Sequence, residues 1–226
     1  MAIPEFDRSA CQMRLSDGAD RMGITLSESQ QGQLLDYLAL MSKWNKAYNL
    51  TAVRDPVEMV GRHLLDSLVL LPYLKGNNCL DMGTGPGLPG IPLAIMRPGI
   101  RFILLDSNSK KVRFLRQVVL ELGLDHCEPV HSRIEGYQAE HPFEVITARA
   151  LTSLPKLLEL SRALRSDESE LLAMKGRVPE LEIEEIKAAY DCTIIPLQVA
   201  FTEGERCLLR VRRVVSETPL ISDTAL

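Results

Sequence analysis

Four glycines stand close together after a short apolar run, in the pattern Gly83-x-Gly85-x-Gly87-x-x-Gly90. This order is typical of a buried strand that enters a tight loop and then starts a helix. Glycine has no Cβ, so the backbone can turn sharply at these positions and can approach a ligand closely. The pattern therefore predicts a cofactor-binding loop, with a ligand-free Gly/Pro loop as the alternative.

Two kinds of cofactor fit such a loop. Gly85-x-Gly87-x-x-Gly90 matches the dinucleotide fingerprint, in which a helix N-terminus faces a pyrophosphate. The longer pattern, which begins at Asp81, fits S-adenosylmethionine better. An acid at the end of the strand would repel a pyrophosphate, whereas it would suit the cationic sulfonium and ammonium groups of S-adenosylmethionine. We therefore expect S-adenosylmethionine, held by Gly83, Gly85 and Gly87.

An acidic residue also ends the next predicted strand. The run Arg101–Asp106 reads as a buried strand, and Asp106 stands at about the distance from the glycines at which a carboxylate meets ribose hydroxyls. Its alternative role is to cap the next helix together with Ser107. Ligands of doubly wound sheets bind at the carboxyl ends of the strands, so Asp106 is predicted to bind the cofactor.

Two later loops are expected at the same edge of the sheet. Ile134 and Glu135 follow a third short strand, where the loop would lie beside the adenine, although an ordinary loop fits the sequence equally well. Arg149 ends the fourth strand, near the point where a doubly wound sheet binds its ligands. Arg149 is therefore predicted to face the cofactor or the substrate, the alternative being an exposed structural arginine.

Strand and helix patterns alternate through most of the chain and end in two strands. Strands are expected at 79–82, 101–106, 128–131, 143–150, 170–174, 192–197 and 207–215, and helices at 9–22, 27–48, 56–71, 91–96, 109–123, 154–164 and 179–189. This order predicts an α/β fold with a seven-stranded, mostly parallel sheet and one antiparallel strand. We expect an N-terminal helical extension over residues 1–75, the main domain over 76–215 and a loose tail over 216–226.

The composition is that of an ordinary globular protein, with 46% hydrophobic and 25% charged residues in 226. No apolar run reaches the length of about 18 residues that a membrane span needs, and the N-terminus lacks the features of a signal peptide. The five cysteines lie far apart without a CxxC pair. Reduced thiols, a cytoplasmic location, no metal site and a monomer are therefore expected. The net charge of −4 means that any nucleic acid must bind to a local basic patch.

The acceptor of a transferred methyl group determines which side chains the reaction needs. Methylation of an exocyclic adenine amine usually employs an Asn/Asp-Pro-Pro-aromatic motif after the fourth strand, but residues 147–150 read Thr-Ala-Arg-Ala. Methylation of cytosine C5 needs a cysteine nucleophile, and no Pro-Cys pair stands near that edge. Guanine N7 has a free lone pair and needs no general base, so positioning alone can supply much of the acceleration. No catalytic side chain is predicted for this reaction.

Several segments together resemble one known family. They are 43–51 (KWNKAYNLT), 62–67 (RHLLDS), 83–92 (GTGPGLPGIP), 105–107 (LDS), 148–150 (ARA), 175–176 (KG) and 204–206 (GER). In this order they closely resemble the bacterial small-subunit ribosomal RNA guanine-N7 methyltransferase family, RsmG, also called glucose-inhibited division protein B. The resemblance covers roughly Leu34 to Val211, and the glycine stretch with its prolines is its most specific part.

The resemblance implies a Rossmann-like class I S-adenosylmethionine-dependent methyltransferase fold. It also implies methylation of guanine N7 in 16S ribosomal RNA, in a hairpin near the decoding site, with the RNA or the small ribosomal subunit as partner. Gly83, Leu88, Ile134, Glu135 and Arg149 match the cofactor contacts of the family. Residues before about 16 and after 216 lie outside the shared pattern, and we assign them no role.

A protein of net negative charge needs a cationic rim to bind RNA. The candidates are Lys43, Lys46, Arg62, His63, Lys175 and Arg177. For Trp44 and Tyr48, near Lys43 and Lys46, the favoured interpretation is that they are core residues of their helix. Two other functions remain as alternatives, a nicotinamide-dependent oxidoreductase that uses the same glycine loop and a non-catalytic RNA-binding factor with the same fold.

Overall fold

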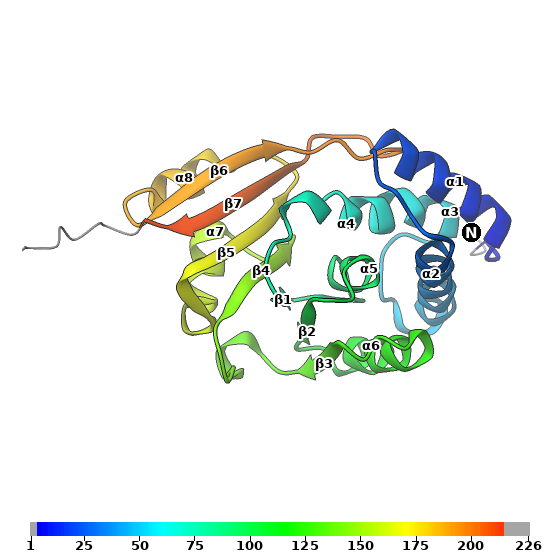
Figure 1. Ribbon diagram of the computed structural model, residues 1–226, viewed down its shortest axis with the longest axis horizontal. Helices are drawn as coiled ribbons and strands as arrows, with labels where there is room; N and C mark the ends of the chain where they lie inside the picture. The colour runs from blue at the N-terminus through cyan, green and yellow to red at the C-terminus, as the bar shows by residue number, and fades with distance from the viewer. Residues whose placement is uncertain (1–3, 215–226) are drawn as a thin grey trace, which may run out of the picture.

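A seven-stranded sheet forms the centre of the molecule in the computed structural model, which describes residues 4–214 (Figure 1). The strands are β1 (Asn78–Met82), β2 (Arg101–Asp106), β3 (Cys127–His131), β4 (Phe143–Arg149), β5 (Arg165–Lys175), β6 (Tyr190–Pro196) and β7 (Cys207–Arg213). Their order across the sheet is β3-β2-β1-β4-β5-β7-β6, and β7 alone runs antiparallel to its two neighbours. The predicted sheet is confirmed.

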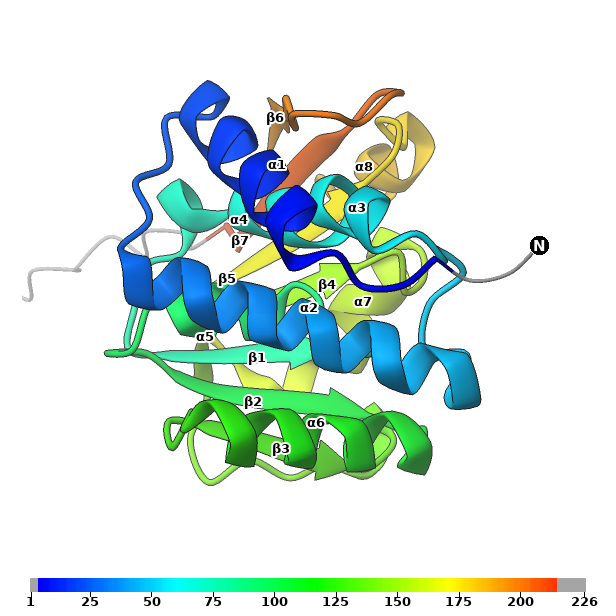
Figure 2. The ribbon, with the colours of Figure 1, turned by 90° about the vertical axis from the view of Figure 1, so that its right-hand side faces the viewer.

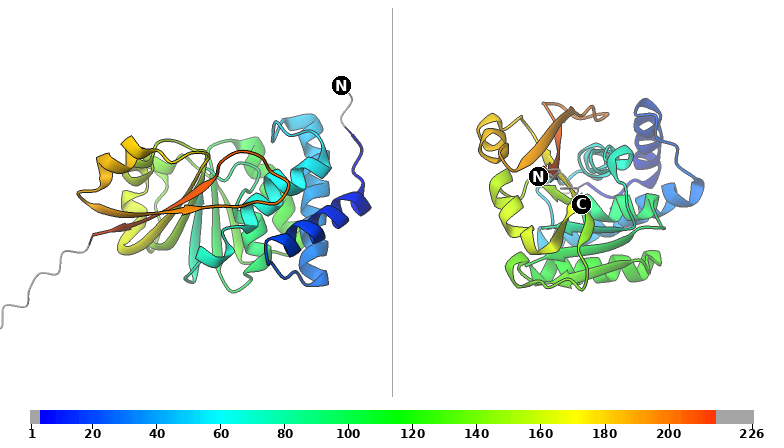
Figure 3. Two further views of the ribbon diagram at one scale, coloured as in Figure 1. Left: turned by 90° about the horizontal axis from the view of Figure 1, so that it is seen from above. Right: turned by 60° about the vertical axis from the view of Figure 1, so that its left-hand side comes forward.

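Helices cover both faces of this sheet. On the side of one face lie α2 (Glu28–Tyr48), α3 (Pro56–Met59), α4 (Asp66–Leu68), α5 (Gly90–Met96) and α6 (Ser109–Leu122), with α1 (Arg8–Arg21) packed on α2 and α3, and on the side of the other lie α7 (Leu154–Leu160) and α8 (Glu180–Ile186). Figure 2 shows α2 between α1 and α6. Figure 3 (left) shows strands β6 and β7 toward one end of the molecule, with the loop between them reaching toward α1 and α2 at the other. The main apolar core takes residues from both sides of the boundary predicted at residue 75.

Local sequence explains where the long helices begin and end. Ser27 and Gln30 form a capping box at the start of α2, and Asn49 ends that helix in the left-handed conformation. Asn108 caps α6 through its side chain, and Gly123 ends it at a φ of 63°. Trp44 is half-buried and packs on Phe114 of α6, with their ring centroids 5.6 Å apart. These contacts fix the C-terminal end of α2 beside the start of α6.

The helix predicted over residues 56–71 runs without a break over 56–68, but it is not α-helical throughout. Helix α3 gives way to a π-helix at Val60–Leu65, which is followed by the short α4 and a 3-10 turn at Leu71–Tyr73. In this segment the Asp66 amide reaches back to the carbonyl of Gly61, five residues earlier. Wider turns of this kind are frequent at functional sites, because they release carbonyl groups for other donors.

Several predicted bounds also differ. Strand β5 begins at Arg165, five positions before the predicted start at 170, and pairs there with Phe143. Helices α7 and α8 are shorter than predicted, and a 3-10 turn at Arg162–Leu164 follows α7. The predicted tail at 216–226 and the end of the last predicted strand lie outside the described residues. No helix within residues 4–214 has both the length and the apolar character that crossing a membrane requires.

Candidate active site

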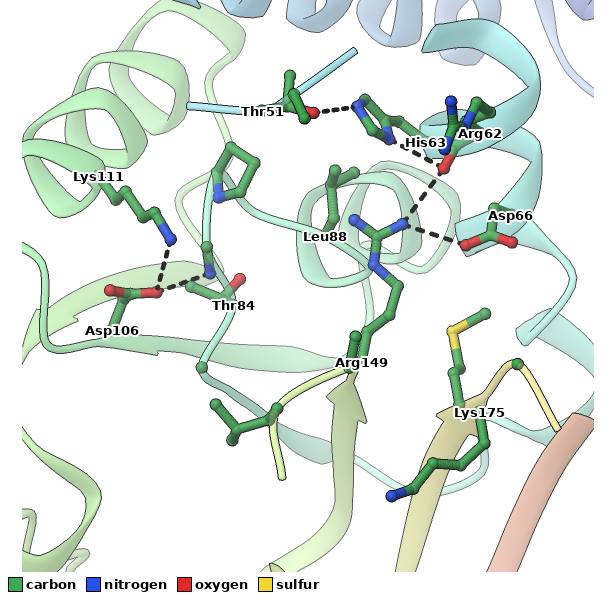
Figure 4. Close-up of a pocket in the computed structure, with 18 of the residues that line it drawn as sticks. Thr51, Arg62, His63, Asp66, Thr84, Leu88, Asp106, Lys111, Arg149 and Lys175 are labelled. Atoms are coloured by element: carbon green, nitrogen blue, oxygen red, sulfur yellow. Dashed lines mark hydrogen bonds and ion pairs between the residues drawn. The ribbon is translucent and has the colours of Figure 1, made fainter. Parts of the chain in front are cut away.

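A cleft of about 1030 Å³ opens at the carboxyl ends of β1, β2, β4 and β5 (Figure 4). The β1–α5 loop, the end of β2 and the turn after β3 line one part of it, and the π-helix, Arg149 and the β6–β7 loop line the other. Most of the sequence-predicted cofactor residues line the cleft, namely Gly83, Gly85, Leu88, Asp106, Ile134, Glu135 and Arg149. The fold therefore brings these seven residues together from the carboxyl ends of four strands and the loops that follow them.

Asp81 supports the glycine loop from behind. Its buried carboxylate accepts hydrogen bonds from the Thr84 hydroxyl at 2.5 Å, the Gly90 amide at 2.8 Å and the Thr147 hydroxyl at 2.9 Å. Burial raises the pKa of this carboxyl above its usual value. Asp81 does not line the cleft. Its contacts assign it to holding the loop, in contrast to the sequence-based expectation that it would face the cations of a cofactor.

The glycines of the loop have different roles. Gly83 and Gly85 line the cleft at φ values of 67° and 62°, which few other residues adopt. Gly87 does not line it, although it was predicted to bind the cofactor. A Cβ there would lie 2.6 Å from Ile91 and 2.8 Å from Leu115, so Gly87 lets the loop pack on the helices behind it. The Tyr37 hydroxyl donates to the Pro86 carbonyl at 2.8 Å and fixes the same turn from α2.

Asp106 is part of the cleft wall and also part of the turn. Its Oδ2 accepts the Gly85 amide at 2.8 Å, and its Oδ1 accepts the Asn108 amide at 2.7 Å. The Lys111 ammonium lies 4.0 Å from Oδ2. Asp106 therefore fixes the loop that follows β2 and still presents a carboxylate to the cleft. The cap of the next helix is Asn108, whereas Asp106 together with Ser107 was the cap considered from the sequence.

Arg149 and Asp66 form an ion pair at the centre of the second part of the cleft. The Arg149 Nη1 donates to Asp66 Oδ2 at 3.1 Å and to the Arg62 carbonyl at 3.3 Å. Arg206 donates from Nε to the other Asp66 oxygen at 2.7 Å. Asp66 thus joins the end of β4 to the loop that precedes β7. Figure 4 shows the Arg149 guanidinium between Asp66 and Leu88.

His63 is buried beside this ion pair. Its Nδ1 lies 2.9 Å from the Arg62 carbonyl, which can only accept, so Nδ1 carries the proton. The Thr51 hydroxyl then donates to Nε2 at 2.8 Å. Burial, followed by the charge of Arg149, lowers the pKa of His63 to about 4. The imidazole is therefore neutral, with both nitrogens in hydrogen bonds.

Three of the six residues proposed for a cationic rim, Arg62, His63 and Lys175, line the cleft, and the other three do not. Arg62 is exposed and lines the cleft, whereas Lys43, Lys46 and Arg177 are exposed outside it. The Lys175 ammonium donates to the Thr152 carbonyl at 2.8 Å and to Glu182 at 3.1 Å, so its charge is already paired. Figure 4 shows this side chain turned away from Arg149.

Sequence reasoning assigned no role to several residues that line the cleft. They are Thr51, Lys111, Glu203 and Arg206 among others. Their positions in loops or at the start of a helix gave little signal, although the segments 43–51 and 204–206, which contain Thr51 and Arg206, contributed to the family resemblance. Among residues 4–214, no group of three or more His, Cys, Asp or Glu side chains is placed to hold a metal ion.

Comparison with known sequences places this geometry in a family. The family model for rRNA small subunit methyltransferase G (GidB) matches residues 30–209. The chain belongs to the rRNA small subunit methyltransferase G family. Ribosomal RNA small subunit methyltransferase G of Ectopseudomonas mendocina (strain ymp) is 55% identical over 205 residues, which cover 89% of this chain and 95% of that protein. The protein of that name from Marinobacter nauticus is 52% identical, covering 88% and 94% of the two chains.

Solved structures support the fold assigned to this rRNA small subunit methyltransferase G family member. The glycopeptide N-methyltransferase MtfA complexed with S-adenosyl-L-methionine aligns with a TM-score of 0.56 at 10% identity, over 66% of this chain and 86% of its own. A SAM-dependent methyltransferase from Aquifex aeolicus aligns with a TM-score of 0.54 at 19% identity, over 74% and 97%. The chain therefore has the Rossmann-like fold of S-adenosylmethionine-dependent methyltransferases.

Proposed function

We propose that this chain transfers the methyl group of S-adenosylmethionine to N7 of a guanine in 16S ribosomal RNA near the decoding site. Family membership supports the ribosomal RNA substrate class, and the methyltransferase fold supports the donor. The observation that carries the proposal is the cleft, in which the open glycines, the Asp106 carboxylate and the Arg149 guanidinium converge. When bound there, S-adenosylmethionine supplies an electrophilic methyl group on a cationic sulfur.

The cleft residues fit the parts of this donor. Asp106 presents a carboxylate that can accept from ribose hydroxyls, and Gly83 and Gly85 leave the backbone open beside it. Ile134 and Glu135 stand where the adenine is expected. Arg149 uses Nη1 for Asp66 and Arg62, which leaves Nε and Nη2 for a carboxylate. Together with Leu88, these are the residues to which we assign donor binding.

The groups near Arg149 support an acceptor that attacks with its own lone pair. His63 has both nitrogens in hydrogen bonds, and Asp66 has both oxygens in ion pairs. Burial raises the pKa of the Cys207 thiol, which disfavours a thiolate nucleophile for carbon methylation. Guanine N7 needs neither a base nor a nucleophile, so the chain has to align it in line with the methyl–sulfur bond. N7 lies in the deep groove of an RNA helix, so the target base must lie in a loop or distorted segment.

We assign RNA contacts to the exposed cations Lys43, Lys46, Arg62 and Arg177, whose charges can meet phosphates. His63 and Lys175 complete the set of proposed RNA contacts. His63 is neutral and Lys175 is paired with Glu182, so both can contact the RNA only through hydrogen bonds and packing rather than through a free charge. Arg62, His63 and Lys175 line the cleft, whereas Lys43, Lys46 and Arg177 do not. We therefore expect the RNA to contact the chain both in the cleft and outside it.

The test is to incubate the protein with labelled S-adenosylmethionine and small ribosomal subunits that lack the modification, and then to locate the label. We expect label on 16S RNA at a guanine whose strand becomes cleavable by aniline after borohydride reduction, which is a property of N7-methylguanine. Label on an exocyclic amine, on carbon or on protein would contradict the assignment. NADH, added in place of S-adenosylhomocysteine, should give no thermal stabilisation.

A second arm tests the absence of a general base. Glu203 and Glu205 line the cleft on the β6–β7 loop, and we have assigned neither carboxylate a role in donor binding, so both are candidates for a general base. We expect Glu203→Gln and Glu205→Gln to retain methyl transfer. Their methyl-transfer rate should not decrease when the pH is lowered below 6. Loss of transfer in either variant at unchanged RNA affinity would indicate proton abstraction and a different acceptor atom.

A further inference from the structure

One carboxylate in the cleft connects two arginines from distant parts of the chain. Asp66 stands at the start of α4 and is almost completely buried. Arg149 ends β4, and Arg206 stands directly before β7, 140 positions after Asp66. Each arginine donates to a different oxygen of Asp66, at 3.1 and 2.7 Å. The ion pairs therefore fix the two arginines relative to each other.

Arg206 is anchored more firmly than Arg149. Besides the bond from its Nε to Asp66, its Nη1 donates to the carbonyls of Glu203 at 2.8 Å and Gly204 at 3.3 Å. Arg206 thereby closes the end of the β6–β7 loop and holds the Asp66 carboxylate in one orientation. The second oxygen of Asp66 is then directed at Arg149.

Arg149 depends on this arrangement for its direction. An arginine side chain has several rotatable bonds, so a guanidinium at the end of a strand points in one direction only where fixed acceptors hold it. Asp66 and the Arg62 carbonyl supply those acceptors, and both meet the same nitrogen, Nη1. The other side of the guanidinium is left toward the glycine loop and Leu88 (Figure 4).

We propose that Asp66, oriented by Arg206, is a positioning residue that aims Arg149 at the carboxylate of the amino-acid part of S-adenosylmethionine. The inference rests on the proposed function for the identity of the donor. It also makes the β6–β7 loop part of the donor site, although that loop has no contact with the glycine loop among the hydrogen bonds of the described residues. Removing the Asp66 charge should then weaken ligands that carry the donor carboxylate and spare ligands that lack it.

The experiment compares two ligands by titration calorimetry. S-adenosylhomocysteine carries the amino acid, and 5′-methylthioadenosine lacks it. Asp66→Asn should weaken binding of S-adenosylhomocysteine at least about tenfold and leave that of 5′-methylthioadenosine within about twofold. Arg149→Gln should show the same pattern. The double variant should bind S-adenosylhomocysteine no more weakly than Arg149→Gln alone, because Asp66 acts through Arg149.

Arg206→Gln keeps the experiment decisive if Asp66→Asn does not fold. It leaves the ion pair of Asp66 and Arg149 in place but frees the carboxylate, so S-adenosylhomocysteine should bind about threefold more weakly and 5′-methylthioadenosine unchanged. Glu170→Gln is the matched control, since Glu170 also pairs with two arginines but lies outside the cleft. Its affinities for both ligands should equal those of the parent.

Three results would overturn the proposal. They are unchanged S-adenosylhomocysteine binding in Asp66→Asn, equal weakening of both ligands, and additive losses in the double variant. Failure of the donor assignment looks different, because the parent chain would then bind neither ligand.

Discussion

Two carboxylates of this chain each pair with two arginines, one beside each end of strand β7. Asp66 meets Arg206, directly before β7, and Arg149 of β4. Glu170 of β5 meets Arg210 and Arg212, both in the second half of β7. The charges are the same in number and sign, but only the first group lines the cleft.

The difference lies in how the guanidinium groups are used. Arg210 donates to Glu170 from Nε and Nη2, both at 2.7 Å, so the two nitrogens that could bind a second carboxylate side by side are already in hydrogen bonds. Burial alone raises the pKa of Glu170, but the hydrogen bonds from Arg210 and Arg212 bring it below its usual value. Arg149 offers Asp66 a single nitrogen and keeps the others. Glu170 accepts hydrogen bonds from two nitrogens of Arg210 and links β5 to β7, so that pair stabilises the sheet. Asp66 accepts from one nitrogen of Arg149, so it can hold that arginine in position while the other nitrogens bind a ligand.

The largest effect on the free energy of unfolding is expected from His63, the neutral histidine beside the Asp66 ion pairs. His63 has a pKa of about 4 in the folded chain and an ordinary value of 6.5 when unfolded. The unfolded chain therefore binds more protons between these values, and stability falls as the pH drops from 6.5 to 4. Urea unfolding should show the parent losing up to about 3 kcal/mol relative to His63→Gln over this window. His131→Gln, at an exposed histidine, should follow the parent. Parallel profiles for the parent and His63→Gln would show that burial does not suppress its charge.

A smaller effect should follow from breaking the distal pair. Glu170→Gln leaves two guanidinium groups without a counter-charge at a partly buried site, and we expect the free energy of unfolding to fall by about 2 kcal/mol. Denaturant unfolding measures this loss, and the exposed neighbour Glu168→Gln is the control. Methyl-transfer activity of the folded variant should equal that of the parent. A changed Kd for S-adenosylhomocysteine in Glu170→Gln would contradict the idea that the Asp66 group positions the ligand whereas the Glu170 group only stabilises the sheet.

The smallest effect concerns two exposed lysines in the last turns of α2. Reversing charge at Lys43 and Lys46 should weaken RNA binding about tenfold at low salt and flatten its salt dependence, because phosphate contacts release counterions. The affinity for S-adenosylhomocysteine should not change. The control pair Lys156→Glu and Lys187→Glu reverses exposed charges near α7 and α8, on the other face of the sheet. Equal losses in both pairs, measured by filter binding, would mean that RNA responds to net charge alone.

The features that could be predicted from the sequence are those that depend on residues close together in the chain. The succession of strands and helices along the chain, the glycine loop and the residues at the strand ends follow from local patterns, so Asp106 and Arg149 could be placed at one edge of the sheet. The partners of these residues could not be found in this way. Asp66 and Arg206 are far apart in the chain, and no spacing rule joins a helix residue to a loop residue at that distance.

The orientation of side chains was the other limit. Lys175 was predicted from its place after a strand, but that place does not reveal that Glu182 takes its ammonium. Asp81 likewise ends a strand and still points behind the loop. The π-helix had no recognised signal, although Gly61 within it lies close to the chain at Phe201, where a Cβ would be 3.3 Å from the carbonyl oxygen. Such contacts follow from the packing of whole elements.

Phe201 links the first helix to the last loop. Its ring, in the β6–β7 loop, lies under the guanidinium groups of both Arg14 and Arg21 of α1, at 4.3 and 4.8 Å from the ring centroid. Figure 1 shows this loop reaching α1 across the top of the molecule. Between the two arginines, Gly18 lets the helix approach, since a Cβ there would lie 2.2 Å from Leu65. A shortened chain that starts after α1 would lose the contacts of Arg14 and Arg21 with Phe201. The loop that carries Arg206 would then be less firmly held, so the methyl-donor pocket would lose rigidity although every pocket residue was still present.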